Sequence, residues 1–130
     1  MAFALIIPRI ADSNILVFQR RDNKAPTDPD VLGLFGGSIE EGEDPSDAAQ
    51  REFGEETSLR LELDQFHLLA ETSMPTASGD AKVYLFAVQI PDEPFEVYEG
   101  IGYERYSKSE FLARTDISKG AAHLLRQTSL

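Results

Sequence analysis

The sequence predicts an α/β fold in which a mixed β-sheet lies between helices, in three layers and in one domain that spans residues 1–130. Three observations support this prediction. Short strand-like segments dominate the chain. Two segments with helix start signals stand among them, one internal and one near the end. A chain of 130 residues with 42% hydrophobic content is long enough to bury a core.

The first third of the chain predicts two strands, a loop and a short apolar run. Residues 2–8 and 15–20 are apolar enough to form short strands. Residues 25–30 hold two prolines and two aspartates and therefore predict a loop. The apolar run at 31–35 ends at a glycine pair, which we interpret as a glycine turn.

The internal helix has a clear start signal. Asp44 is an N-cap residue, Pro45 suits the first helical position, and Asp47 adds an acidic side chain to the first turn. These residues predict a helix from about Pro45 to Thr57.

The strongest strand signal lies in the second half, at residues 82–90, which are almost continuously apolar. Such a run is typical of a central strand that is covered on both faces. Around it the sequence predicts extended segments at 59–63 and 66–73, a turn at 74–80, short strands at 95–98 and 103–107, a helical turn at 109–113, and a last helix at 119–127 capped by Ser118.

Composition excludes several classes of function. The chain has no cysteine, so it can form neither a disulfide framework nor a thiolate metal site. No apolar run approaches the ~20 residues of a membrane span. The net charge of −11 argues against nucleic-acid binding, which requires basic surface. We therefore expect a cytoplasmic protein that acts on a small molecule without a membrane partner.

Acidic residues are concentrated in one stretch. Eight of the chain's 23 acidic residues lie between Glu40 and Glu56, with one base, Arg51. On a helix, the spacing of Glu52, Glu55 and Glu56 places all three on one face. Such a face is either a solvated surface or a set of oxygen ligands, and oxygen ligands suit Mg²⁺.

The same stretch resembles the signature of the Nudix hydrolases, Gly-x5-Glu-x7-Arg-Glu-U-x-Glu-Glu-x-Gly-U, in which U is a bulky aliphatic residue. The resemblance covers 23 of the 130 residues and is carried by Gly37, Glu43, Arg51, Glu52, Glu55, Glu56 and Leu59. Phe53 stands at an aliphatic position, and Ser58 stands where the family has glycine. A left-handed conformation at Ser58 would cost roughly 1 kcal/mol.

This resemblance implies a Nudix-like α/β/α sandwich and the hydrolysis of a nucleoside diphosphate linked to another group, with Mg²⁺ or Mn²⁺. It implies that Glu52, Glu55 and Glu56 bind the metal, with the Gly37 carbonyl as a further ligand. Arg51 would orient a glutamate by ion pairing. Glu43 would stabilise the loop–helix arrangement or lie near the metal and substrate.

Two further roles follow from the resemblance. The general base is either a helix glutamate such as Glu55 or an acid from a later loop, for which the candidate is Glu99; a solvated turn residue is the alternative. Arg20 and Arg21 end the second predicted strand, where they can reach substrate phosphates or serve as surface charges.

The motif does not identify the substrate. We favour a (d)NTP or oxidised (d)NTP, cleaved to NMP and pyrophosphate, over a dinucleoside polyphosphate or nucleotide sugar. The alternative outside catalysis is a nucleotide-sensing binding module. A homodimer is expected only at the level of the family.

Overall fold

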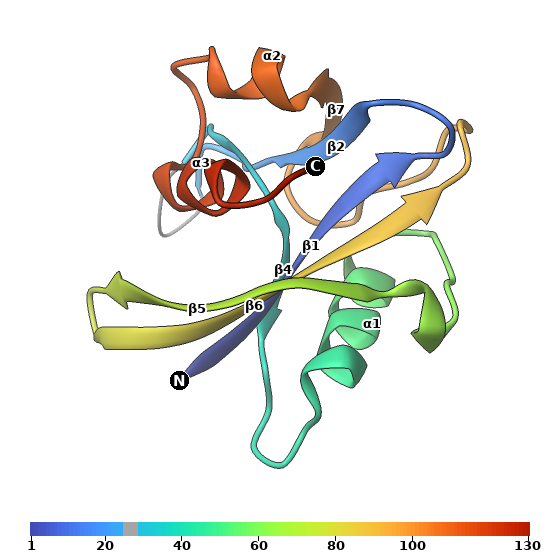
Figure 1. Ribbon diagram of the computed structural model, residues 1–130. Coiled ribbons are helices and arrows are strands. Elements are labelled where there is room, and N and C mark those ends of the chain that lie inside the picture. Colours follow the sequence, from blue (N-terminus) through green and yellow to red (C-terminus); the bar gives the residue numbers. More distant parts are fainter. Residues whose placement is uncertain (25–28) are drawn as a thin grey trace.

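The computed structural model, which describes residues 1–24 and 29–130, contains a mixed sheet with helices on both faces (Figure 1). Residues 25–28 of the predicted loop lie outside this described part. The helices are α1 (Pro45–Glu56), α2 (Lys108–Leu112) and α3 (Lys119–Arg126), with a 3₁₀ turn η1 (Leu63–Gln65). The strands are β1 (Ala2–Ile10), β2 (Ile15–Arg20), β3 (Leu32–Gly33), β4 (Phe35–Ser38), β5 (His67–Thr76), β6 (Gly79–Ile90) and β7 (Gly102–Ser107).

Strand β1 is the centre of the sheet, whose order is β3-β2-β1-β6-β5. It pairs in parallel with β6 along its whole length, from Ala2 opposite Lys82 to Ile10 opposite Ile90. On its other edge, β4 pairs with the first half of β1 and β2 pairs near its end, both antiparallel. Strand β7 pairs with β2, which brings the chain after residue 100 beside the N-terminal strands.

Each face of the sheet has its own apolar core, which confirms the predicted α/β fold class. One core contains Ala48, Ala49 and Phe53 of α1, packed on Ile6 and Phe86 of the central strands. The other face carries α2 and α3, with a core formed by Ile7, Phe18, Leu85, Phe111, Leu124 and Leu125. None of the described helices is long and apolar enough to cross a membrane.

Two predicted boundaries were wrong because proline proved compatible with the sheet. Strand β1 continues past Pro8. The pairing of β1 with β4 ends at Ile6 and its pairing with β2 is at Arg9, so Pro8 lies between the two. The predicted turn at 74–80 is instead a hairpin, because β5 continues to Thr76 opposite Gly79. In the described part of the chain, strand β5 lies at the edge of the sheet, where a proline such as Pro75 is tolerated.

Two predicted extended segments do not form regular strands. Residues 59–62 are irregular, and η1 follows them. Residues 95–98 contribute one bridge, between Val97 and Thr57. Both segments lie next to the end of α1, where a few specific hydrogen bonds replace a ladder. The three helices lie within one residue of the predicted boundaries.

Candidate active site

Helix α1 begins and ends through local hydrogen bonds. The Asp44 side chain accepts a bond from the Ser46 backbone N–H, and Pro45 occupies the first turn. At the other end, the Thr57 hydroxyl donates to the Phe53 carbonyl. Among the described non-glycine residues only Asp12 and Asp30 have positive φ, so Ser58 does not bear the left-handed strain that the motif suggested.

The glycine pair before the helix lies in strand β4, and our interpretation of a glycine turn was wrong. Gly36 and Gly37 pair with Leu5 and Ala4 of β1. Gly36 has a φ of 128°, and a Cβ there would collide with the Ala4 carbonyl oxygen. A Cβ on Gly37 would lie 2.7 Å from the Glu52 carboxylate. Glycine is therefore required by the close approach of β1 and of α1.

Arg51 connects the acidic residues of α1 to the loop before the helix. Its guanidinium donates to Glu43 at 2.8 Å, to Glu52 at 3.1 Å, to Glu55 at 3.3 Å and to the Ser38 carbonyl. The bonds that Glu43 accepts from Arg51 and from the Glu40 backbone N–H lower its pKa to about 2. Arg51 thus orients two of the predicted metal ligands, Glu52 and Glu55. Glu43 in turn fixes the position of Arg51 and of the loop before α1.

Glu56 is the buried acid of the site, with 3% of its surface exposed. Its Oε1 accepts a 2.8 Å bond from the Gly36 backbone N–H. Burial, the contact with Glu99 and the charge of Glu52 raise the pKa of Glu56 to about 9. Burial also raises the pKa of Glu52. Carboxylates from α1 and from the loop before β7 therefore meet at one place.

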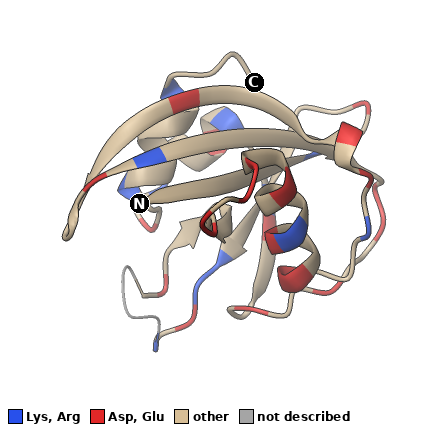
Figure 2. Cartoon of the chain, turned by 90° about the horizontal axis from the view of Figure 1, so that it is seen from below, with Lys and Arg blue, Asp and Glu red and all other residues tan. Residues whose placement is uncertain are grey.

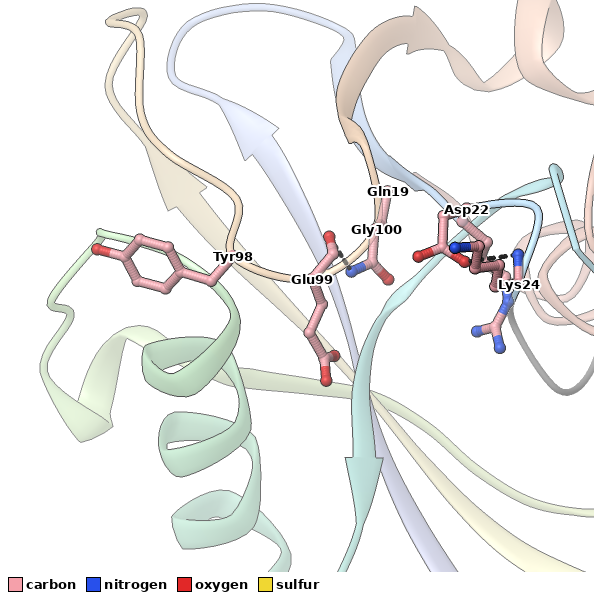
Figure 3. A pocket seen from close by; sticks show the side chains of 7 residues that line it. Gln19, Asp22, Lys24, Tyr98, Glu99 and Gly100 are labelled. Carbon is pink, nitrogen blue, oxygen red and sulfur yellow. Dashed lines mark hydrogen bonds between the residues drawn. The ribbon is translucent and has the colours of Figure 1, made fainter.

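Figure 2 shows that many of the acidic residues lie on α1 and on the loops beside it. Next to this region lies a pocket of 460 Å³ lined by Gln19, Arg21, Asp22, Lys24, Tyr98, Glu99 and Gly100. Figure 3 shows that the side chain of Tyr98 points away from Gln19 and Lys24. The charged residues that line the pocket are two bases, Arg21 and Lys24, and two acids, Asp22 and Glu99.

Arg20 lies in a different environment from Arg21. Its guanidinium bonds Glu104 at 2.7 Å, Asp116 at 2.9 Å and the Asp30 carbonyl at 2.7 Å. Its side chain is only 15% exposed. These contacts favour a structural role for Arg20, and its predicted contact with the substrate stays a prediction.

The residues on α1 fit a hard divalent cation. Glu52, Glu55 and Glu56 offer only oxygen atoms, and the absence of a Cβ on Gly37 leaves room for its backbone beside the Glu52 carboxylate. Within residues 1–24 and 29–130, no three acidic or histidine side chains already converge as a metal cluster. Arg51 holds Glu52 and Glu55 instead. The ligand assignments stay predictions.

The fold and the carboxylate-rich helix α1 are typical of one class of hydrolase. A family model described as NUDIX domain matches residues 2–126, and the chain belongs to this family. Its hydrolases cut pyrophosphate bonds in substrates that contain a linked nucleoside diphosphate. No curated protein matches the chain in sequence.

Solved structures share the fold at low sequence identity. The Escherichia coli dihydroneopterin triphosphate pyrophosphohydrolase has a TM-score of 0.78 and 21% identity, over 97% of this chain and 92% of that one. A MutT protein from Methanosarcina mazei has a TM-score of 0.80 and 16% identity, over 96% and 88%. The NUDIX domain of Shewanella oneidensis NrtR, solved with ADP ribose, has a TM-score of 0.75 and 14% identity, over 98% and 84%.

Sequence reasoning missed two residues of this region, Gln19 and Ser58. Gln19 is 5% exposed, and its side chain donates to the Glu99 carbonyl. The sequence feature that could have identified Gln19 is its position as a polar residue in a strand that is otherwise apolar up to Arg20. Ser58 accepts a bond from the Glu96 backbone N–H, and its signal was the departure from the family's glycine.

Proposed function

We propose that this protein is a Mg²⁺-dependent pyrophosphohydrolase whose substrate is a nucleoside triphosphate, normal or oxidised, cleaved to NMP and pyrophosphate. The observation that carries the proposal is that Glu56 contacts Glu99 and lies close enough to Glu52 for their charges to interact, while the Glu52 carboxylate lies beside Gly37. Burial and the neighbouring acids raise the pKa of Glu56 to about 9. Such a cluster favours a bound cation, because a cation relieves the repulsion that otherwise retains a proton.

The residues have separate tasks in this proposal. Glu52, Glu55, Glu56 and the Gly37 carbonyl would hold Mg²⁺, which when bound neutralises phosphate charge and activates a water. Arg51 keeps Glu52 and Glu55 in place through its ion pairs. Glu99 accepts the proton of the water that attacks phosphorus, because its carboxylate lies next to Glu56 and lines the pocket. Glu55 is the alternative base.

Charge in the pocket supports a polyphosphate substrate. Arg21 and Lys24 line it together with the acids Asp22 and Glu99, so the pocket holds two cationic side chains that can contact phosphate oxygens. The Escherichia coli neighbour is named as a pyrophosphohydrolase of a triphosphate. The NrtR domain was solved with ADP ribose, which keeps diphosphate-linked substrates and a nucleotide-binding role as alternatives. Cytoplasmic location and a homodimer stay predictions from the sequence.

A substrate panel tests the proposal. The protein is incubated with Mg²⁺ and dNTPs, an oxidised dGTP, a dinucleoside polyphosphate, a nucleotide sugar and ADP ribose, and the release of phosphate or pyrophosphate is measured. We expect pyrophosphate and NMP from at least one triphosphate. Binding without cleavage of every compound would contradict the hydrolase and favour a nucleotide sensor.

Glu56→Gln tests the site separately from the fold. The amide can accept from the Gly36 N–H and donate to Glu99, as the protonated acid does, so we expect metal-free stability to change by less than about 1 kcal/mol. Turnover should fall by at least about 10²-fold, because an amide is a poor ligand for Mg²⁺. Thermal unfolding and steady-state kinetics measure the two effects. Near wild-type turnover would rule out Glu56 as a ligand.

A further inference from the structure

The segment that carries Glu99 is held on two sides. On one side, the Tyr98 N–H donates to the Glu56 carbonyl at 2.7 Å, and the Ser58 N–H donates to the Glu96 carbonyl at 2.9 Å. On the other side, the Ile101 N–H donates to the Arg20 carbonyl of β2 at 3.0 Å. Residues 96–101, which we call the Glu99 loop, therefore bridge the end of α1 and the end of β2.

Gln19 adds a side-chain contact to the β2 side of this loop. Its Nε2 donates at 3.1 Å to the carbonyl of Glu99 itself. Figure 3 shows this bond and shows the Glu99 carboxylate pointing away from it, toward α1. Gln19 is 5% exposed in a strand that is otherwise apolar up to Arg20. A buried amide in such a strand costs free energy unless it is bonded, and the Glu99 carbonyl is its bonding partner.

The backbone next to this contact leaves little freedom. Gly100 has a φ of 73°, and a Cβ there would collide with the Arg20 carbonyl oxygen. The chain can therefore pass close to β2 only with glycine at this position. This close approach brings the Glu99 carbonyl within reach of Gln19.

Ser58 adds the matching contact on the α1 side. Its hydroxyl accepts from the Glu96 N–H at 2.9 Å, in addition to the backbone bond between the same two residues. The family signature has glycine at this position, and glycine could form only the backbone bond. Because φ at Ser58 is not positive, serine fits here without strain.

We propose that Gln19 and Ser58 are positioning residues that hold the Glu99 loop from opposite sides, so that the Glu99 carboxylate faces Glu56 and the proposed metal site. This inference rests on the proposed function, since it assigns these residues to the same reaction. Neither side chain touches the reacting atoms in this proposal. Each affects the reaction only by fixing the position of Glu99. A base displaced by about 1 Å can lose up to about 10²-fold in rate.

The experiment compares Gln19→Met and Ser58→Ala with the wild type, each alone and combined with Glu99→Gln. Methionine keeps the volume of Gln19 without its donor. We expect each single change to lower kcat by about 10-fold to 10²-fold. KM should stay within about twofold in Ser58→Ala, because Ser58 does not line the pocket, whereas Gln19 does. In the Glu99→Gln background neither change should lower kcat further. Ser58→Thr, which keeps the hydroxyl, should restore most of the turnover.

Gln50→Met is the matched control. The Gln50 Nε2 also donates to a backbone carbonyl, that of Leu61, at 3.0 Å, but it does not touch the Glu99 loop. We expect its turnover to equal that of the wild type. Hydrogen exchange of the metal-free protein gives a readout without catalysis: residues 96–101 should exchange faster in Gln19→Met and Ser58→Ala than in Gln50→Met.

The failures are distinguishable. An effect of Gln19→Met that is equally large in the Glu99→Gln background would overturn the inference, as would unchanged exchange of the Glu99 loop. Full turnover in Glu99→Gln would remove the role of Glu99 and this inference, while the hydrolase stands. A wild type that cleaves no compound of the panel would overturn the proposed function itself.

Discussion

Arg51 shows how one residue organises the acidic side of α1. It bonds four different partners on the helix and on the chain before it, so the carboxylates of Glu52 and Glu55 are oriented without a metal. Arginine suits this task, because its planar guanidinium has five donors in fixed directions. A lysine at this position would retain the charge but could not satisfy the same geometry.

Gly37→Ala is expected to damage the site more than the fold. The new Cβ would lie 2.7 Å from the Glu52 carboxylate, so that side chain must move away. We expect turnover to fall by about 10²-fold, because catalysis is sensitive to small displacements of oriented groups. Steady-state kinetics with the best substrate of the panel measure this loss. Turnover within about threefold of the wild type would contradict the proposed place of Gly37.

At the scale of single residues, the sequence identified the acids of α1 but not their surroundings. The i, i+3 and i, i+4 spacing was enough to place Glu52, Glu55 and Glu56 near one another. It could not show that Glu56 is buried and Glu55 exposed, with 58% of its side chain accessible, because burial depends on β4 and the Glu99 loop. The contacts of Arg20 were equally hidden, since its partners lie 84 and 96 residues later.

Helix α1 is the element that positions most of the site, yet its intrinsic helix tendency is not optimal. Gly54 lies inside it, where glycine costs roughly 0.5–1 kcal/mol relative to alanine. The nearest atom to a Cβ at this position is the Arg60 Nη1, at 3.9 Å, which is ordinary contact distance. No packing contact therefore requires glycine here.

Gly54→Ala is expected to stabilise the protein by about 0.5–1 kcal/mol and to raise Tm by a few degrees, with turnover unchanged. Urea or thermal unfolding measures the gain. The same substitution at Gly37 serves as the contrast, because there the Cβ meets Glu52. A destabilised Gly54→Ala variant would show that α1 tolerates no added volume on this face.

Among the elements, those with strong local signals were predicted well. The N-cap at Asp44 and the apolar run at 82–90 gave α1 and most of β6. The irregular segment 59–62 and the single bridge at Val97 were not predictable. The chain around Val97 is held by hydrogen bonds to residues 56–58, at the end of α1 and far away in the sequence. Pro75 led to the wrong prediction of a turn, since only the order of the described strands shows that β5 is an edge strand paired with β6.

At the scale of the whole molecule, an ion-pair network ties the two ends of the chain together. Arg20 of β2 bonds Glu104 of β7 and Asp116, which precedes α3. Arg114 also bonds Asp116, and the Tyr106 hydroxyl bonds Glu104. Arg20 holds the pKa of Glu104 below its ordinary value, and Arg114 together with Arg20 does the same for Asp116.

Arg20→Met is expected to lower the free energy of unfolding by about 1–3 kcal/mol at pH 7. Because both carboxyl pKa values are depressed in the folded protein, this contribution is present above their unfolded values of about 4 and is lost as pH falls through the folded values. The difference between variant and wild type should therefore shrink as the pH falls below about 4 and through the depressed folded pKa values of Glu104 and Asp116. Urea unfolding at each pH measures it.

Arg105→Met provides the control for this network. Arg105 pairs with Asp92 at 2.8 Å, but the two side chains are 53% and 71% exposed. Exposed pairs contribute little, so we expect a change within about 0.5 kcal/mol at every pH. If Arg20→Met and Arg105→Met were equal, the network would have no special part in holding β2, β7 and α3 together.

The parallel pairing of β1 with β6 also constrains the order in which the chain can fold. Ala2 lies opposite Lys82, so the central ladder joins segments that leave the ribosome at very different times. At about 5–20 residues per second, β1 waits for several seconds before its partner is made. During that interval an apolar strand has only β2 and β4 to cover its edge. The sheet closes late, and a nascent chain of this protein is most exposed to aggregation just before β6 emerges.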